Sequence, residues 1–282
     1  MSVGIRKPLR GQTRLRRLPT AISPLKGEKE TSVGLRVLVH TPTLSVGPGV
    51  APHRKVILVD TSSASSLTPL LNRHFDAVLW DMDGTLISSI HVTERCWGQW
   101  MEHYGYPAEH YHQFHGTPAR TIVETLLPAH LHDEGFHRIV DLEMNDTTGI
   151  TLLPGAHQAL AALPTQRRAI VTSSTRDLAL RRLEVTGIAM DTLVTADDVT
   201  HGKPHPDPYL RAAHLLGVDP TRCVVFEDAP SGLAAGRAAG CVTVGLPGTH
   251  ALADLTADVL LPSLEAIQVV STEEGVVFSA AL

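Results

Sequence analysis

The sequence predicts an α/β protein in which helices cover both faces of a parallel sheet and a helical insertion follows the first strand. Three observations predict it: short apolar runs typical of buried strands, helical segments between the later runs, and one long helical interval near the first run. Strands that alternate with helices form parallel sheets, because each connection carries the chain back to the same end of the sheet. The strands are predicted at Ala77–Asp81, Arg168–Thr172, Thr192–Thr195, Cys223–Glu227, Val242–Leu246 and Asp258–Leu261.

Helices are predicted between the later strands, and proline and glycine mark their ends. Pro206 suits the first turn of a helix, where its missing N–H is not needed. Gly217 and Gly240 suit helix ends, where a left-handed backbone conformation is common. The predicted helices cover Ala156–Leu163, Arg176–Val185, Pro206–Leu216, Ser231–Ala239 and Thr249–Leu255.

The interval from Ser88 to Leu153 is too long for an ordinary connection between strands. Its pattern is mostly helical, with helices predicted at Thr93–Tyr104, Pro107–His115, Pro118–Leu126 and Leu131–Asn145. We therefore expect an all-helical domain over residues 88–153, inserted into an α/β core formed by residues 75–87 and 154–271.

Charge separates the N-terminal quarter from the rest of the chain. The 282 residues are 43% hydrophobic, which suits a globular protein of one or two domains. Residues 1–75 carry a net charge of +9 and residues 76–282 a net charge of −14. The acidic globular part argues against nucleic acid as a partner. The lack of an apolar run of about 20 residues argues against a membrane partner.

Residues 1–74 are predicted to form a basic, disordered extension. Residues 1–27 contain no acidic residue and show neither helical nor strand period. Three interpretations stay open. The first is a solvated tail, which a start codon assigned too far upstream would also produce. The second is an Arg-rich transit peptide, and the third is an arm that binds nucleic acid.

Cysteine and histidine spacing predicts no metal cluster. The three cysteines are odd in number and lack CxxC spacing, which predicts buried free thiols in a reducing compartment and hence a cytoplasmic protein; they are Cys96, Cys223 and Cys241. Six of the sixteen histidines fall in two groups, for which we favour a solvated helix surface over a metal cluster because no known ligand spacing is completed. They are His110, His112, His115, His130, His132 and His137.

Asp81 and Asp83 directly follow the apolar run Ala77–Trp80. Two carboxylates this close at the end of a buried strand repel each other and lose hydration, so the pair predicts a cation. Oxygen ligands of this kind favour Mg²⁺. A calcium loop also begins with Asp-x-Asp, but Gly84 comes too early for one. A purely structural turn is the other alternative.

Polar residues also follow three later strands, where an α/β sheet places its chemistry. Thr172 and Ser173 suit an anion such as phosphate, or else simply cap the next helix. Lys203 either balances carboxylates or phosphate, or is a solvated charge. Glu227 and Asp228 are metal ligands or a helix cap. Each signal is weak alone, and their shared position at strand ends predicts a single site.

Taken in order, these motifs resemble those of the haloacid dehalogenase-like hydrolase superfamily. Asp81–Thr85 looks like its first motif, Thr172-Ser173 the second, Lys203 the third and Glu227-Asp228 the fourth. The resemblance covers about Phe75–Val270. It implies a Rossmann-like parallel sheet core, with the helical insertion as the superfamily's first type of cap domain.

Three longer segments are similar to small-sugar and polyol phosphatases, including glycerol phosphate and 2-deoxyglucose 6-phosphate phosphatases. They are Thr-Ser-Ser-Thr-Arg-Asp at 172–177, His-Gly-Lys-Pro-His-Pro-Asp-Pro-Tyr-Leu at 201–210 and Phe-Glu-Asp-Ala-Pro-Ser-Gly at 226–232. Ser88 is a departure, because many relatives have an acid there. It bears on the subfamily and not on catalysis.

The resemblance implies a phosphoaspartate mechanism. Asp81 is the nucleophile, and Asp83 protonates the leaving alkoxide and then takes a proton from water. Mg²⁺ is expected to bind Asp81, Asp228 and the backbone carbonyl of Asp83. Glu227 either binds the metal or orients Lys203.

The same resemblance assigns the phosphoryl oxygens to Lys203 and to Thr172 or Ser173. Ser173 is preferred because it lies further beyond the strand end. Substrate choice is expected to come from the cap, where Gly116 permits close backbone approach and Arg120 contacts the substrate; a surface position for Arg120 is the alternative.

These expectations describe a Mg²⁺-dependent phosphatase that acts on a small phosphorylated sugar or polyol, as a monomer or weak homo-oligomer. The inserted domain holds only three basic residues, Arg95, Arg120 and Arg138, which disfavours highly charged or polymeric substrates. The alternatives are a sugar phosphomutase of the β-phosphoglucomutase type and a non-catalytic binding protein on the same fold.

Overall fold

A parallel sheet forms the centre of the protein. A computed structural model describes residues 67–71, 73–114 and 117–281, so the predictions for residues 1–66, His115 and Gly116 lie outside the described residues. The sheet has six strands in the order β5-β4-β1-β6-β7-β8, and all neighbouring strands are parallel. The predicted strands are confirmed, with ends within one residue of expectation. They are β1 (Ala77–Trp80), β4 (Arg168–Val171), β5 (Leu193–Val194), β6 (Cys223–Glu227), β7 (Val242–Gly245) and β8 (Val259–Leu260).

The register of the sheet brings the predicted motifs to one edge. Trp80 at the end of β1 pairs with Ile170 of β4 on one side and with Phe226 of β6 on the other. Asp81 therefore follows β1 at the same edge where β4 and β6 end. This edge is the carboxyl end of the strands, where open α/β sheets bind ligands.

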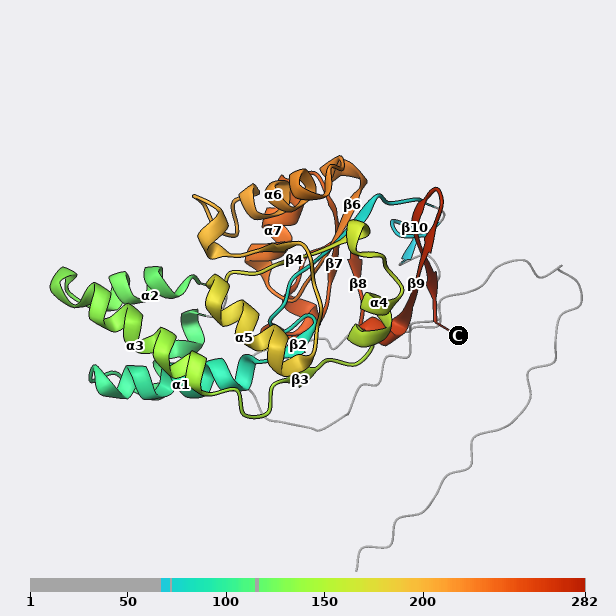
Figure 1. Cartoon of the computed structure of the whole chain (residues 1–282). Helices are drawn as coiled ribbons and strands as arrows, with labels where there is room; N and C mark the ends of the chain where they lie inside the picture. Colours follow the sequence, from blue (N-terminus) through green and yellow to red (C-terminus); the bar gives the residue numbers. More distant parts are fainter. Residues whose placement is uncertain (1–66, 72, 115–116, 282) are drawn as a thin grey trace, which may run out of the picture. The chain divides into compact units, whose positions relative to one another are not determined.

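Side chains of successive strand residues point to opposite faces, so β1 contributes to two apolar layers. Ala77 and Leu79 belong to a layer with residues of α6 (Asp207–Leu216) and α7 (Pro230–Ala238). Val78 and Trp80 belong to a larger layer with residues of α4 (Ala156–Ala161) and α5 (Arg176–Thr186). Figure 1 shows α6 and α7 together along one side of the sheet. The sheet is therefore covered on both faces, as predicted.

The insertion after β1 is helical, and a short antiparallel pair lies where the chain leaves and re-enters the core. That pair is β2 (Ile87–Ser88) with β3 (Thr151–Leu152). The helices are α1 (Ile90–His103), α2 (Ala119–Leu126) and α3 (His132–Asn145), with 3₁₀ segments η2 (Ala108–Phe114) and η3 (Ala129–Leu131). Trp100 of α1 is fully buried, and its Nε1 donates to the carbonyl of Gly135 in α3 at 2.7 Å.

Within the insertion, the helix expected at Pro107–His115 is the 3₁₀ helix η2, and two elements of the core also differ from the sequence prediction. The helix expected at Thr249–Leu255 is only the 3₁₀ turn η7 (Leu252–Asp254). The backbone N–H of Thr249 donates to the carboxylate of Asp228 at 2.6 Å, which holds this segment as a loop against the core. The second difference is a C-terminal hairpin of β9 (Ile267–Thr272) and β10 (Gly275–Ala280).

This hairpin and the segment before β1 join the core beyond its expected limits. Val276 and Phe278 of β10 are buried, and the Phe278 ring lies 5.7 Å from that of Phe75 and 5.9 Å from that of Phe226. Leu67 and Leu70 are buried in the same layer. The core layer thus includes residues outside the expected 75–271, because the segment just before β1 and the C-terminal hairpin both pack into the layer that contains Val78 and Trp80. Within the described part of the chain, no helix is both long enough and apolar enough to cross a membrane.

Candidate active site

A cavity of about 340 Å³ lies at the carboxyl edge of the sheet, lined by residues of the core and of the helical cap. The core contributes the residues that follow β1, β4 and β6 together with Lys203. The cap contributes Trp97, Arg120, Phe136 and Glu143. The structure thus brings all four sequence motifs to one cavity.

Asp81 is buried at the carboxyl end of β1. It is 6% exposed, and its carboxylate accepts a hydrogen bond from Lys203 Nζ at 2.7 Å. Burial raises the pKa of Asp81, and the nearby carboxylates of Glu227 and Asp228 raise it further, against the opposing effect of Lys203. A buried carboxylate with too little positive charge around it is the electrostatic setting that a bound cation relieves.

Lys203 is held between two carboxylates. Its Nζ donates to Asp81 Oδ1 and to Glu227 Oε1, both at 2.7 Å, and to the carbonyl of Val171 at 2.9 Å. Burial by itself lowers the pKa of Lys203, but Asp81 and Glu227 outweigh burial and raise it. All three N–H groups of a charged ammonium therefore have partners.

Glu227 uses both of its carboxylate oxygens on protein donors. Oε1 accepts from Lys203 and from the hydroxyl of Tyr209 at 3.2 Å, and Oε2 accepts from the backbone N–H groups of Asp228 and Ala229, each at 2.9 Å. Four donors fill the acceptor sites of a carboxylate. Gly232 gives Glu227 its space, because a Cβ there would lie 1.6 Å from Oε1.

Asp228 presents a carboxylate close to that of Asp81. Ligand atoms of Asp81, Glu227 and Asp228 all lie within 4.8 Å of one another. Burial and, after it, the nearby Glu227 carboxylate raise the pKa of Asp228 to about 7, because the group is 2% exposed beside another acid. Gly84 leaves room for it: with φ at +88°, its Cβ would lie 2.1 Å from Asp228 Oδ2. Oxygen donors this close and this buried fit a hard divalent ion such as Mg²⁺.

Asp83 is held by four side-chain donors. Oδ1 accepts from Ser89 Oγ at 2.6 Å and from Arg182 Nη1 at 2.7 Å. Oδ2 accepts from Ser174 Oγ at 3.1 Å and from Thr172 Oγ1 at 3.3 Å. The carboxylate is therefore fixed in one orientation beside Asp81.

The two hydroxyls expected to bind phosphate differ in their surroundings. Thr172 is 3% exposed, and its hydroxyl both donates to Asp83 and accepts from the N–H of Ser174 at 3.1 Å. Ser173 is exposed and lines the cavity. Ser173 is thus the one whose side chain a ligand in the cavity can reach without breaking these bonds.

This geometry agrees with the comparison of the sequence with protein families. The family described as haloacid dehalogenase-like hydrolase matches residues 75–240, which include all four motifs. The chain belongs to the haloacid dehalogenase-like hydrolases. The match leaves out the hairpin β9–β10, which this hydrolase packs against its sheet.

Curated relatives of this hydrolase are phosphatases. Hexitol phosphatase A of Escherichia coli (strain K12) is 39% identical over 70% of this chain and 95% of its own. Glycerol-1-phosphate phosphohydrolase 1 of Saccharomyces cerevisiae is 36% identical over 72% of this chain and 88% of its own. 2-deoxyglucose-6-phosphate phosphatase 1 of the same yeast is 32% identical over 71% of this chain and 92% of its own.

Solved structures share the fold of this hydrolase. A haloacid dehalogenase family hydrolase from Deinococcus radiodurans R1, crystallised with bound phosphate and sodium, is 30% identical, with a TM-score of 0.52 over 67% of this chain and 92% of its own. A putative β-phosphoglucomutase from Thermotoga maritima is 28% identical, with a TM-score of 0.51 over 67% of this chain and 95% of its own.

Arg182, Glu143 and Ser174 line the cavity of this hydrolase but were not predicted from the sequence. A signal for two of them is present. Arg182 lies on the buried stripe of α5 with Leu178 and Ala179, and Glu143 lies four residues after buried Ile139 on α3. A charged residue on an apolar helix stripe needs a buried partner, so each position indicates an ion pair.

The cap residues expected to choose the substrate are only partly described. Arg120 lines the cavity, and its guanidinium lies 4.2 Å from the centre of the Phe136 ring and 3.2 Å from Asp133. Its side chain is 47% exposed. Gly116 lies outside the described residues. Arg120 is therefore at once a cavity residue and a partly exposed one.

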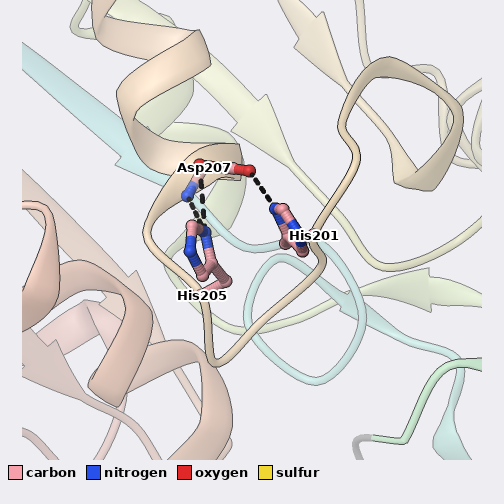
Figure 2. A group of neighbouring side chains, drawn as sticks. All are labelled: His201, His205 and Asp207. Atoms are coloured by element: carbon pink, nitrogen blue, oxygen red, sulfur yellow. Dashed lines mark hydrogen bonds and ion pairs between the residues drawn. The ribbon is translucent and has the colours of Figure 1, made fainter.

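A second group of potential ligands lies on the loop that carries Lys203 (Figure 2). His201 and His205 each contact a different oxygen of Asp207, both at 3.0 Å. All three side chains are at least a third exposed. Both carboxylate oxygens of Asp207, at the start of α6, are occupied by these contacts. We therefore interpret the group as an interaction that holds the loop against α6.

Proposed function

We propose that this chain is a Mg²⁺-dependent phosphomonoesterase that hydrolyses small sugar or polyol phosphates through a phosphoaspartate on Asp81. The observation that carries the proposal is the placement of Asp81 between Lys203 and Asp228, with Asp83 held two residues away. Phosphatase activity is also the activity named for the curated relatives.

Each residue of the site has a role in two successive displacements. The carboxylate of Asp81 attacks phosphorus while Asp83 gives its proton to the departing alkoxide. Asp83 then takes a proton from the water that cleaves the acyl phosphate. Lys203 and Ser173 bind the equatorial oxygens, whose negative charge is largest during transfer. Glu227 positions Lys203, since its four acceptor sites are already filled.

The carboxylates of Asp81 and Asp228 and the backbone carbonyl of Asp83 would hold the Mg²⁺ ion. When bound, the ion offsets the repulsion between the Asp81 carboxylate and an anionic phosphate. The Deinococcus relative was crystallised with bound phosphate and sodium, which supports the binding of an anion and a cation by a protein of this family.

The size and lining of the cavity support a small substrate. About 340 Å³ accommodates a phosphorylated sugar or polyol, and residues of the cap line the cavity together with those of the core. The three cysteines are free and buried, which supports a reducing, cytoplasmic location.

The test is hydrolysis of p-nitrophenyl phosphate and a panel of hexitol, glycerol and sugar phosphates with Mg²⁺. The Asp81→Asn variant keeps the size of the side chain but removes the nucleophile, so turnover is expected to fall by about 10⁴-fold or more. Wild-type protein with no activity above this variant on any substrate would end the proposal.

The phosphomutase alternative has one supporting observation, the fold likeness to a putative β-phosphoglucomutase. The curated relatives favour hydrolysis instead. Incubation with β-glucose 1-phosphate separates the two activities. A phosphatase releases free phosphate, whereas a mutase forms glucose 6-phosphate without it.

A further inference from the structure

Arg182 joins the cap to the site, although it belongs to helix α5 of the core. Its side chain is only 3% exposed. Nη1 donates to Asp83 at 2.7 Å and to Ser174 Oγ at 3.2 Å, both in the core. Nη2 donates to Glu143 on α3 and to Thr93 Oγ1 on α1, both in the cap and both at 3.0 Å. One buried guanidinium thus contacts both domains and the expected acid.

The two oxygens of Asp83 have different donors. Oδ1 faces Arg182 and the hydroxyl of Ser89, and Oδ2 faces the hydroxyls of Ser174 and Thr172 at longer distances. A guanidinium can only donate, whereas a hydroxyl can turn and accept. Oδ1 is therefore fixed as an acceptor from Arg182, and this bond together with the hydroxyl contacts at Oδ2 holds the carboxylate in one orientation.

Glu143 fixes Arg182 from the cap side. Its side chain is 8% exposed, so its carboxylate needs a buried partner, and Arg182 is that partner. The pair can form only when α3 of the cap lies against α5 of the core. The hold of Arg182 on Asp83 therefore depends on the position of the cap.

We propose that Arg182 is a positioning residue that holds Asp83 for proton transfer to the leaving group, and that Glu143 makes this hold depend on the cap. The proposal rests on the phosphatase function above. In the first step the new bond is between Asp81 and phosphorus, and the bond from phosphorus to the leaving oxygen breaks. The bonding pair stays on that oxygen, which receives the proton from Asp83.

If the proposal is right, the loss of activity on removing Arg182 depends on how strongly the leaving group needs protonation by Asp83. A sugar or polyol alkoxide is a strong base that leaves only when protonated, whereas p-nitrophenolate is a weak base that leaves without a proton. The value of kcat/KM reports the steps up to the phosphoenzyme, so it excludes the later step in which Asp83 takes a proton from water.

The test compares kcat/KM on the best sugar or polyol phosphate and on p-nitrophenyl phosphate. For Arg182→Ala we expect a fall of about 100-fold on the first and less than about 5-fold on the second, since general acids typically contribute 10²–10⁴-fold. Arg182→Lys should recover part of the loss. An equal loss on both substrates would overturn the proposal, because it would point to phosphate binding or to general disruption of the site.

Arg181→Ala is the matched control. Arg181 is the adjacent arginine on the same helix, its side chain is 40% exposed, and it pairs with Glu184 on the surface. Its removal should leave both kcat/KM values within about 2-fold of wild type, as is usual for exposed ion pairs.

Glu143→Gln provides the test if Arg182→Ala does not fold, because it keeps the side-chain size while removing the charge that holds Arg182. It should show the same preference for p-nitrophenyl phosphate, with about a 10-fold loss on the sugar or polyol phosphate. No change in the ratio of the two substrates would overturn the proposal. Wild-type protein inactive on both substrates would instead defeat the phosphatase function, so the two failures are distinguishable.

Discussion

The two walls of the cavity are built in different ways. On the core wall, Asp81, Lys203 and Glu227 are each less than 10% exposed, and Lys203 lies 2.7 Å from each of the two carboxylates. On the cap wall, Arg120 and its partner Asp133 are 47% and 82% exposed and lie 3.2 Å apart. Buried, fully bonded charges cost much to rearrange, whereas exposed pairs contribute little to stability. The core wall is thus suited to hold reacting groups in fixed positions. The residues of the cap wall can change at little cost in stability, which suits a wall that sets substrate specificity.

Glu143 is the exception on the cap side. It is a buried cap acid, and burial raises its pKa although Arg182 lowers it. Through Arg182 it contacts the core wall rather than the solvent. The cap therefore contacts Arg182 of the core through Glu143 and Thr93, while Arg120 stays partly exposed.

The largest expected effect is removal of divalent ions, which acts on the core wall alone. Chelation should lower turnover by about 10³-fold or more, because a bound ion stabilises the transferring group by several kcal/mol. Mg²⁺ should restore turnover and raise the unfolding temperature of the wild type but not of Asp228→Asn. Full turnover in chelator, or an unchanged temperature shift in the variant, would show that the core wall is not the site of the ion.

Adding a methyl group at Gly232 tests how tightly Glu227 is packed in the core wall. Its Cβ would lie 1.6 Å from Glu227, which must then move and loosen Lys203. Gly232→Ala should lower the free energy of unfolding by about 2 kcal/mol and kcat by about 100-fold. The control is Gly98→Ala on cap helix α1, where the new methyl meets Ala108 at an ordinary 3.5 Å. Equal effects of both variants would contradict the contrast between the walls.

Arg120→Ala tests the cap wall as the place of substrate choice. Loss of a contact to substrate hydroxyls or charge should change the ratio of kcat/KM between two sugar phosphates by about 10-fold. The p-nitrophenyl phosphate rate should change little, because that substrate has no sugar to contact. Arg95→Ala is the control, since Arg95 pairs with Asp146 and does not line the cavity. A uniform loss on every substrate would place Arg120 with the chemistry instead.

The smallest effect is expected from Asp146 on the cap surface. A hydrogen bond from Arg95 lowers the pKa of Asp146 to about 2, so its stabilising effect is present above its usual pKa near 4 and is lost as the pH falls toward 2. Asp146→Asn should lower the unfolding temperature by no more than about 3 °C at pH 7 and have no effect near pH 2. A comparison of the two unfolding temperatures across this pH range checks the sign.

Much of the fold could be predicted because its signals are local. The six strands of the sheet are short apolar runs bounded by turn residues, and each was found within one residue of its observed limits. The hairpin β9–β10 was missed because the surface that buries it, beside Phe75, is distant in sequence and no local signal shows it. Thr249–Leu255 has a helical composition, but its bond to Asp228 keeps it a loop.

The sequence by itself determined the acidic pair Asp81 and Asp83, the order of the motifs and their common edge, because strand period and parallel pairing place strand ends together. Only the tertiary structure decided how Glu227 is used and which carboxylates Arg182 meets. The contact between Arg182 and Asp83 spans 99 residues of chain and that with Glu143 spans 39. A charged residue at a buried helix position predicts that it has a partner of opposite charge. Which residue is that partner depends on how helices of the two domains pack together.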